Sequence, residues 1–417
     1  MANLLNQGSI VLTPTAYDNG KVLCVKPSDG SGDFDFLRAT EATRINSQGL
    51  VEVVADNLPR INYDGFSFDG SGNIIPDSGC GSWLFEPQST NLIPYSEDFS
   101  QWNIVRSTST ANALISPSGE TNADKLQSNT TGASGSWYRE FVSSFSGNHI
   151  FSVFAKAGTT DFMQLRIDGV GGVVYDLSDG TVKSQTSAIG SVEDYGNGWY
   201  RCSAQATASS STTVLILVGN VNMTTVNWFA TSGDNIYIWG AQLEAKPYAT
   251  SYIPTSGQAS GVTRNSDVCA NGGSAASINS SDGVLFGQFS TIASDNTSAW
   301  INLSDGTSNN WLFVGRDGDK VRAFLKSNGV VIFSNQTTPL ADINKVALSY
   351  KSGDIRLYIN GVQKLNLTSS FAFSQTLTRL DFGVYNGGAT TTEVTWKQVA
   401  VWKETLTDTE LQELTTI

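Results

Sequence analysis

The fold is decided by one stretch, Lys345-Val-Ala-Leu-Ser-Tyr350 followed by Gly353-Asp-Ile-Arg-Leu-Tyr-Ile-Asn-Gly-Val362. Both runs are rich in β-branched, leucine and aromatic residues, which favour strands. The Asn360-Gly361 step accepts the positive φ angles of a tight hairpin turn. The stretch therefore predicts a strand, a tight turn and a second strand that itself ends in a hairpin.

Turn signals of this kind are spread over the whole chain, which has eight Asp-Gly and six Asn-Gly steps. Between them lie short runs of strand formers, such as Ile150–Ala155, Val214–Val218 and Thr395–Trp402. Short strands separated by tight turns are typical of antiparallel β-sandwiches. The sequence therefore predicts an all-β fold, with an N-terminal segment followed by two sandwiches.

One helix is expected, at the C-terminal end, in Leu406–Leu414. Thr407 is suited to cap it, and Glu410, three residues later, is suited to reach back and complete a capping box. Leu406 and Leu411 are spaced as in a hydrophobic staple. We expect this helix to pack its leucines against the final sheet.

The charge of the chain limits its partners. It carries 25 Lys and Arg against 38 Asp and Glu, a net charge of −13, and contains no basic run. Binding to phosphate groups needs clustered Lys and Arg, so neither nucleic acid nor an anionic membrane is an expected partner. No apolar stretch approaches the ~20 residues of a membrane helix, and the first residues lack the regions of a signal peptide. The many uncharged polar residues are typical of β-sandwich proteins that work outside the cell or on a particle surface, so we expect assembly in a host cytoplasm and release by lysis. A processed secreted chain is the alternative.

The residues that most catalytic and zinc sites require are scarce. The only histidine is His149, and Cys24, Cys80, Cys202 and Cys269 are scattered without a Cys-x-x-Cys pair. This argues against a zinc site and against a nucleophile–histidine triad. The glucanase run E-x-D-x-x-E is absent, although 38 acids supply some glycosidase-like pair by chance. We expect a protein that is not an enzyme and requires no cofactor.

The middle of the chain resembles the family 4/9/22 type of carbohydrate-binding jelly roll. The resemblance is carried by the opening Asn91-Leu-Ile-Pro-Tyr-Ser-Glu-Asp-Phe-Ser-Gln-Trp102 and the closing Gly233-Asp-Asn-Ile-Tyr-Ile-Trp-Gly-Ala-Gln-Leu-Glu244. It implies a jelly roll over residues 91–257. It also implies a structural calcium where the first and last strands meet, with hard oxygen ligands from Glu97, Asp98 and Asp234. The alternative is that these acids are solvated or hydrogen-bonded turn residues.

Sugar binding by such folds uses aromatic rings that stack on pyranose rings. The candidates here are two Trp-Tyr pairs, Trp137 with Tyr138 and Trp199 with Tyr200. Neighbouring strand residues point to opposite faces, so we expect one ring of each pair to face outward. The alternative is one core ring and one rim ring with no ligand.

The last segment, residues 258–417, resembles the laminin-G or concanavalin-like sandwich family. The resemblance implies glycan or calcium binding on one rim through loop acids and amides, for which Asp305, Asn309 and Asp317 are the candidates here. It rests on the opening stretch together with the closing strand and helix, Val399-Ala-Val-Trp402 and Leu406-Thr-Asp-Thr-Glu-Leu411.

Residues 1–90 resemble a module of structural proteins from tailed bacteriophages, which implies an attachment and assembly segment. Arg38, Arg44 and Arg60 lie among acids and are the candidates for paired contacts between chains; surface ion pairs without an assembly role are the alternative. The resemblance is carried by Ser28–Phe36, Arg38–Asn46, Gly49–Glu52, Pro59–Gly65, Trp83–Leu92 and the later Ala249-Thr-Ser-Tyr-Ile-Pro-Thr255.

Together these resemblances imply a structural virion protein, exposed on the particle as a head fibre, tail fibre or capsid decoration. The expected partners are copies of the chain in a homotrimer, other virion proteins and bacterial surface glycans. Two alternatives stay open, a depolymerase that degrades capsule and a secreted bacterial glycan adhesin.

Overall fold

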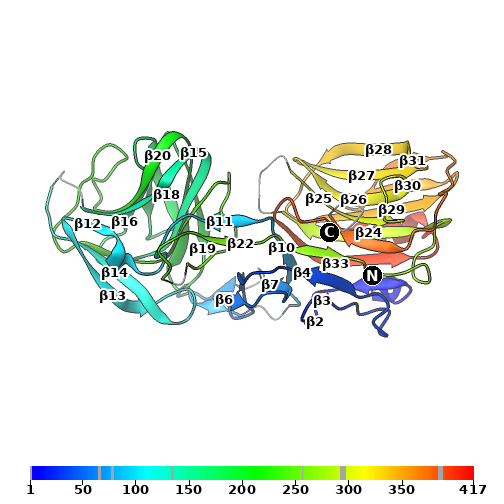
Figure 1. Cartoon of the computed structure of the whole chain (residues 1–417), viewed down its shortest axis with the longest axis horizontal. Coiled ribbons are helices and arrows are strands. Elements are labelled where there is room, and N and C mark those ends of the chain that lie inside the picture. The colour runs from blue at the N-terminus through cyan, green and yellow to red at the C-terminus, as the bar shows by residue number, and fades with distance from the viewer. Residues whose placement is uncertain are drawn as a thin grey trace.

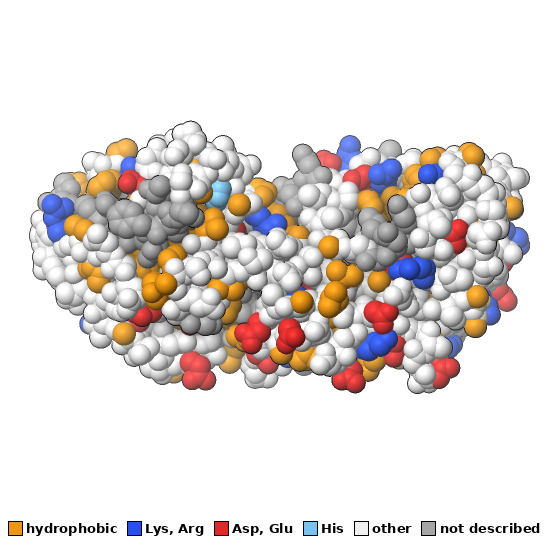
Figure 2. All heavy atoms as spheres, in the orientation of Figure 1, with side chains coloured by type: hydrophobic (Ala, Val, Ile, Leu, Met, Phe, Trp, Pro, Cys, Tyr) orange, Lys and Arg blue, Asp and Glu red, His pale blue; other side chains and the backbone are white. Residues whose placement is uncertain are grey.

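The computed structural model describes residues 2–63, 67–76, 79–132, 136–255, 257–291, 297–383 and 388–417, without the side chains of residues 2, 3, 136–143, 212 and 337. The chain forms two β-lobes that lie side by side along its longest axis (Figure 1). The face seen in Figure 2 consists mostly of uncharged groups, with Lys, Arg, Asp and Glu scattered singly over it. The all-β prediction is confirmed, and no helix in the described residues is long and apolar enough to cross a membrane.

The first lobe is a ten-stranded antiparallel arrangement in the order β13-β14-β21-β15-β20-β16-β17-β18, with β12 paired to β15 and β19 to β20. Its main core is a cluster of buried side chains that includes Phe151, Leu165, Ile216 and Ile238. The strands are β12 (Asn103–Val105), β13 (Ser107–Ile115), β14 (Thr121–Ser128), β15 (Ser136–Ala157), β16 (Phe162–Ile167), β17 (Gly171–Asp176), β18 (Thr181–Thr186), β19 (Ile189–Asp194), β20 (Trp199–Gly219) and β21 (Asn235–Glu244). A 3-10 turn, Phe99–Gln101, precedes them.

The second lobe is a sandwich of a five-stranded and an eight-stranded sheet. The five-stranded sheet has the order β28-β27-β26-β25-β32, and its strands are β25 (Ser298–Ser304), β26 (Trp311–Asp317), β27 (Lys320–Ser327), β28 (Val330–Pro339) and β32 (Arg379–Phe382). The eight-stranded sheet has the order β31-β30-β29-β24-β33-β10-β7, with β1 beside β33. From this segment it takes β24 (Asp282–Ser290), β29 (Asn344–Lys351), β30 (Ile355–Ile359), β31 (Val362–Leu367) and β33 (Val394–Trp402).

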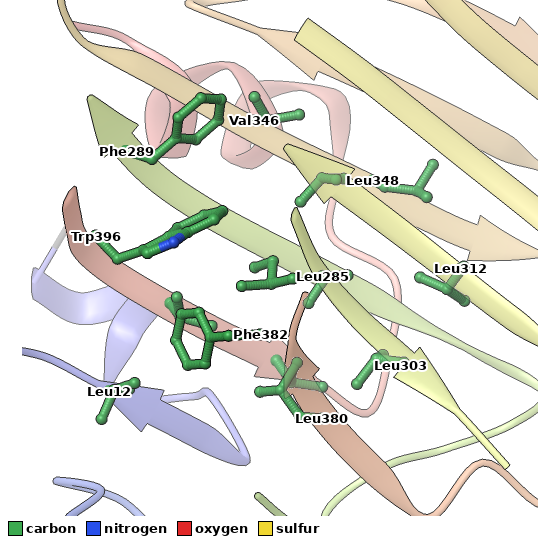
Figure 3. Packing of buried hydrophobic residues seen from close by; sticks show 14 of the residues in the cluster. Leu12, Leu285, Phe289, Leu303, Leu312, Val346, Leu348, Leu380, Phe382 and Trp396 are labelled. Atoms are coloured by element: carbon green, nitrogen blue, oxygen red, sulfur yellow. The ribbon is translucent and has the colours of Figure 1, made fainter. Parts of the chain in front are cut away.

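The core of the second lobe lies between these two sheets. Leu303 and Leu312 of the five-stranded sheet meet Leu285, Leu348 and Trp396 of the eight-stranded sheet (Figure 3). Side chains alternate along a strand, so the residues between these inward positions must face away from the core.

The N-terminal segment completes the second lobe rather than forming a separate unit. Its strands β1 (Ile10–Leu12) and β10 (Ser82–Phe85) both pair with β33, and β7 (Arg60–Asn62) pairs with β10. Leu12 and Trp83 belong to the same buried cluster as the side chains of the sandwich. A second small sheet joins β2 (Tyr17–Asp18), β3 (Lys21–Val22) and β4 (Phe34–Leu37) to β23 (Val268–Ala270).

Two short hairpins of the N-terminal segment reach toward the first lobe. Val51 packs in one buried cluster with Phe154, Trp239 and Tyr252 of the first lobe. The hairpins are β5 (Ala42–Ile45) with β6 (Val51–Val54), and β8 (Ser67–Phe68) with β9 (Ile74–Ile75). The ends of the first lobe are tied by β11 (Ser89–Asn91) with β22 (Val262–Arg264).

The expected C-terminal helix forms as α2 (Asp408–Thr415). Thr407 is its N-cap, and the capping box with Glu410 is complete in both directions. Leu411 and Leu414 are fully buried with the final strands, as the leucine spacing predicted. A second helix, α1 (Ala2–Leu5), is only one turn long and was not expected from the sequence.

Candidate functional site

The outer face of the five-stranded sheet carries a group of aromatic side chains. Ala299, Ile301 and Leu303 belong to the core, so Trp300 between them faces outward. By the same alternation β26 and β27 present further rings on this face, and β27 adds three basic residues, Lys320, Arg322 and Lys326. We call Trp300, Trp311, Phe313 and Phe324 the aromatic platform.

The strand register places these side chains in rows across the sheet. Trp311 lies opposite Lys326 on one side and Ser304 on the other, and Ser304 lies opposite Arg379. The next row consists of Phe324, Phe313, Asn302 and Asp381, and the row after it of Arg322, Gly315 and Trp300. Residues in one row are direct neighbours on the sheet surface.

The rings of the platform are packed against each other. Trp300 stacks on Phe313 with 4.5 Å between ring centroids and 26° between ring planes. Phe313 stacks on Phe324 at 5.1 Å and 17°, and Trp311 lies 4.9 Å from Phe313. Such offset contacts are favourable beyond the area that they bury.

A glycine makes room for Trp300. Gly315 lies opposite it in the register, and a Cβ atom at Gly315 would meet the Ala299 carbonyl oxygen at 2.2 Å and the Trp300 Cα at 2.5 Å. The strands β25 and β26 can therefore approach here only because position 315 has no side chain.

One arginine braces the platform. The Arg322 guanidinium lies 5.5 Å from the Phe313 ring centre and 5.6 Å from that of Phe324, which are cation–π distances. Asp317 Oδ2 accepts a bond of 2.6 Å from Arg322 Nη1 and holds the guanidinium in place.

The two phenylalanines are buried beneath this arrangement, whereas Trp300 and Trp311 are only half-buried. The Trp300 Nε1–H is buried and has no hydrogen-bond partner in the described part of the chain, so Trp300 offers its ring and not its N–H to the surface. The sheet face therefore offers two indole rings with several basic side chains beside them.

Of the aromatic residues that the sequence singled out, Trp199 faces inward. It is 3% exposed and packs in the cluster that joins Val51 to the first lobe. Its Nε1–H donates to the Ile115 carbonyl at 3.1 Å. It is one of the residues that line a cleft of about 530 Å³ between the β8–β9 hairpin and the first lobe, but at 3% exposure its ring is not free to stack on a sugar.

The other three candidates have different places. Tyr200 is half-buried on the opposite side of β20, where its ring lies against the turn at Gly180. Trp137 and Tyr138 lie in β15, and their side chains are outside the described residues.

The acids predicted to hold calcium in the first lobe serve as hydrogen-bond acceptors. Glu97 accepts from Tyr252 Oη at 2.9 Å, and burial raises the pKa of its carboxyl. Asp98 caps the 3-10 turn through the Ser100 N–H, and Asp234 accepts from the Thr231 N–H at 2.8 Å.

A buried acid that the sequence did not single out lies near Asp98. Burial raises the pKa of Asp124 to about 6, and the neighbouring Asp98 charge adds to this effect. No group of three or more His, Cys, Asp or Glu in the described residues is arranged to hold a metal ion.

The rim candidates of the second lobe do not meet. Asp305 follows β25 and Asp317 ends β26, at opposite ends of this hairpin and about 20 Å apart along the strand. Asp305 and Asn309 line a shallow polar hollow of about 390 Å³, in which Asp305 accepts from Thr307 and Asn310.

The prediction that Arg38 and Arg60 form contacts between chains is wrong. Both side chains are fully buried inside the chain, so neither has a surface with which to contact a second copy. Arg38 pairs with Asp267 at 3.1 Å, and Arg60 pairs with Asp267 at 2.6 Å and with Glu86 at 2.5 Å. Arg264 completes this cluster, 2.7 Å from Glu86. We call these five residues the arginine clasp.

Arg44 differs from the other two arginines. It retains partial exposure beside Glu52, to which its Nε donates at 3.1 Å. Its role in contacts between chains stays a prediction.

Sequence reasoning missed the aromatic platform. The alternation around Trp300 was a usable signal, because an aromatic ring occupies the position between core residues. The run Trp311-Leu-Phe-Val-Gly315, in contrast, is apolar at every position and resembles a strand buried on both faces.

Comparison with protein families supports the domain type expected for the second lobe. Residues 279–412 match the model of the concanavalin A-like lectin/glucanases superfamily, which confirms the expected laminin-G or concanavalin-like domain. No curated protein matches the chain significantly.

Several solved structures are similar to parts of the chain. The CBM40 of a sialidase from Ruminococcus gnavus is 16% identical over 35% of this chain and 93% of its own, with a TM-score of 0.30. Domain 4 of a GH43 arabinanase from Geobacillus stearothermophilus, in complex with arabinotriose, is 15% identical over 41% and 84%, with a TM-score of 0.30. Domains LG4-5 of mouse laminin α1 are 12% identical over 64% and 84%, with a TM-score of 0.23.

Proposed function

We propose that this chain is a non-catalytic glycan-binding protein and that the aromatic platform of the second lobe is its contact surface. The observation that carries the proposal is the pair Trp300 and Trp311, two half-buried indoles on the outer face of a sheet whose inner face already fills the core. The match of residues 279–412 to a superfamily named for lectins and glucanases supports it.

The chemistry of the platform suits a sugar. The face of an aromatic ring carries negative charge density, which attracts the weakly positive C–H groups on the flat side of a pyranose. The basic side chains beside the rings supply donors for hydroxyl groups. Apolar rings with a few placed polar groups are typical of specific small-molecule sites.

Binding to a glycan array and titration calorimetry test the proposal, with the variants Trp300→Ala and Trp311→Ala. Each should weaken binding at least tenfold, since truncating a central aromatic residue commonly costs about 2 kcal/mol or more. Phe68→Ala is the matched control, because Phe68 is an exposed aromatic residue of the N-terminal segment. Failure of the wild-type protein to bind any glycan, or unchanged affinity in both tryptophan variants, would overturn it.

A non-catalytic protein would not act as a depolymerase. Incubation with bacterial capsular polysaccharides should then release no new reducing ends. Release of reducing ends by the purified protein would show an enzyme instead.

We further propose that this binding takes place on the particle of a tailed bacteriophage, where the chain is a homotrimeric fibre or decoration subunit that adheres to host glycans. The resemblance of residues 28–92 supports this setting. Val25, Leu37 and Val53 of the N-terminal segment are more than half exposed, which supplies apolar surface for contacts with other chains.

Two measurements test the trimer and its place on the virus particle separately from glycan binding. Light scattering of the purified chain should give a trimer, and antibody labelling of virus particles in the electron microscope should find it on their surface. A stable monomer that is absent from purified particles would overturn the setting and leave the glycan proposal standing.

A further inference from the structure

We infer that the glycan bound at the aromatic platform is acidic and that Lys326 and Arg379 contact its negative groups. This inference rests on the proposed function and specifies the class of its ligand. The starting observation is the row in which Lys326, Trp311, Ser304 and Arg379 follow one another across four strands.

This row places an indole between two basic side chains. Lys326 is the direct neighbour of Trp311, so their Cβ atoms are about 5 Å apart. Three strand spacings separate Lys326 from Arg379, which is about 14 Å. A ligand that stacks on Trp311 therefore has one cation beside it, and an extended chain of sugars that continues across the sheet reaches the second.

The charge of this face is opposite to that of the whole chain. Its outward positions in β26, β27 and β32 hold four basic residues and two acids, whereas the chain has a net charge of −13. The six residues are Lys320, Arg322, Lys326, Arg379, Asp317 and Asp381.

Both acids of the face already have partners. Asp317 accepts from Arg322 at 2.6 Å and from Ser298 at 2.5 Å. Asp381 is fully buried and accepts from Arg379 Nε and Nη2 at 2.7 Å and 2.8 Å. Asp381 therefore offers no exposed negative surface to an acidic ligand, and the charge of Asp317, whose side chain is 19% exposed, is paired with Arg322.

The basic side chains keep donors for a ligand. Arg379 retains Nη1 outside its two bonds with Asp381, and its side chain is 23% exposed. Lys326 is half-buried beside Trp311. An ammonium group next to an aromatic ring, at the edge of water, binds a carboxylate or sulfate more strongly than a fully solvated lysine does.

Three further acids lie near the face. Asp35 of β4 is close enough to Arg379 for the arginine to help lower the pKa of its carboxyl, but Lys21 and Asn271 already donate to it. Asp305 is in the turn after β25, where Thr307 and Asn310 already donate to it. Asp319 is in the turn between β26 and β27, beyond Lys320. None of the three occupies a row of the platform.

Matched pairs of acidic and neutral glycans test the inference. The pairs are oligogalacturonate with its methyl ester, and hyaluronan oligosaccharides with their carboxyl-reduced forms; dextran sulfate and dextran form a third pair for sulfate. At low ionic strength each acidic member that binds should bind at least tenfold more tightly than its neutral counterpart. The difference should shrink as salt is raised, since a ~10 Å screening length applies at about 0.1 M salt.

The variant Lys326→Gln tests whether Lys326 causes the preference for acidic glycans. It should reduce affinity for the acidic members about fivefold or more and for the neutral members by less than about twofold, because the glutamine amide still donates to hydroxyl groups but carries no charge. Trp311→Ala should weaken both. Lys364→Gln is the matched control, because Lys364 is an exposed lysine on β31 of the other sheet.

The outcomes separate the two proposals. Neutral glycans that bind as tightly as acidic ones, or acidic binding that Lys326→Gln does not alter, overturn the inference and leave the glycan proposal standing. Binding of neither kind by the wild-type protein overturns both.

Discussion

Arg60 and Asp267 are 207 residues apart in the chain, yet their side chains form an ion pair of 2.6 Å that is completely buried. Arg60 also holds Glu86, and Glu86 accepts bonds from Ser251 at the end of the first lobe. Because the chain leaves and re-enters the second lobe at this point, the arginine clasp sets where the two lobes join.

Removing Arg60 should destabilise the protein strongly. Arg60→Met leaves Glu86 and Asp267 buried with fewer opposite charges, and breaking a buried pair in this way costs about 3–5 kcal/mol. Urea unfolding followed by circular dichroism measures the change. Lys21→Met, which breaks the exposed pair with Asp35, is the control and should cost about 1 kcal/mol or less. Equal losses in the two variants would contradict this account of the clasp.

The clasp also predicts a loss of stability in acid. Burial opposes ionisation of Glu86, but Arg264 and Arg60 outweigh it and hold its pKa at about 2, below its usual value of 4.5. The unfolded state therefore binds this proton more readily than the folded state does. The stabilisation is complete above pH 4.5 and is lost as the pH falls from 4.5 through about 2.

This contribution is measured as the free energy of unfolding at a series of pH values. Protonation of Glu86 alone should change the free energy of unfolding by at most about 1.4 kcal/mol per pH unit, because one proton is bound. Glu86→Gln should be less stable at neutral pH. Its free energy of unfolding should also depend less on pH below 4.5 than that of the wild-type protein. An unchanged slope in the variant would assign the acid sensitivity to other carboxyl groups.

Gly315 should tolerate no side chain. Gly315→Ala places a methyl group within 2.5 Å of backbone atoms of Ala299 and Trp300, which forces the strands apart at a cost of about 1–3 kcal/mol. It should also displace Trp300 from Phe313 and change the aromatic circular dichroism. Gly70→Ala is the control, since Gly70 has no atom of the described residues, its chain neighbours apart, within 4 Å of an added Cβ. A normal spectrum and full stability in Gly315→Ala would contradict the packing of the platform.

Only one of the four cysteines should react in the native protein. Cys80 is exposed, whereas Cys24, Cys202 and Cys269 are buried and unpaired. Burial raises the pKa of Cys24 to about 12 and raises those of Cys202 and Cys269 as well, so their thiolates are scarce. Titration with a thiol reagent should give one equivalent before unfolding and four after it. More than one rapid equivalent before unfolding would show that a buried cysteine is accessible.

Local features of the chain were predictable because their causes are local. Asn197, Asn271, Asn328 and Asn360 adopt the positive φ angles that their Asn-Gly steps predicted. The capping box at Thr407 formed for the same reason, since it depends on two side chains one helical turn apart.

The candidate sites were predicted less well, because they depend on which strands become neighbours. Trp199 and Tyr200 do point to opposite faces, but only the position of Val51 decides that the tryptophan is covered. Trp311 and Phe313 become part of a platform only because β25 and β27 align with β26 in the observed register.

The amino-acid sequence by itself determined the strands, the turns and the final helix, through alternation, turn chemistry and capping. Only the tertiary structure decided that the N-terminal strands β1 and β10 pair with β33, that Arg38 and Arg60 turn inward, and that the indoles share one face. The physical reason is that a strand with one apolar face is compatible with many partners. Its pairing is chosen by the fit of the whole core.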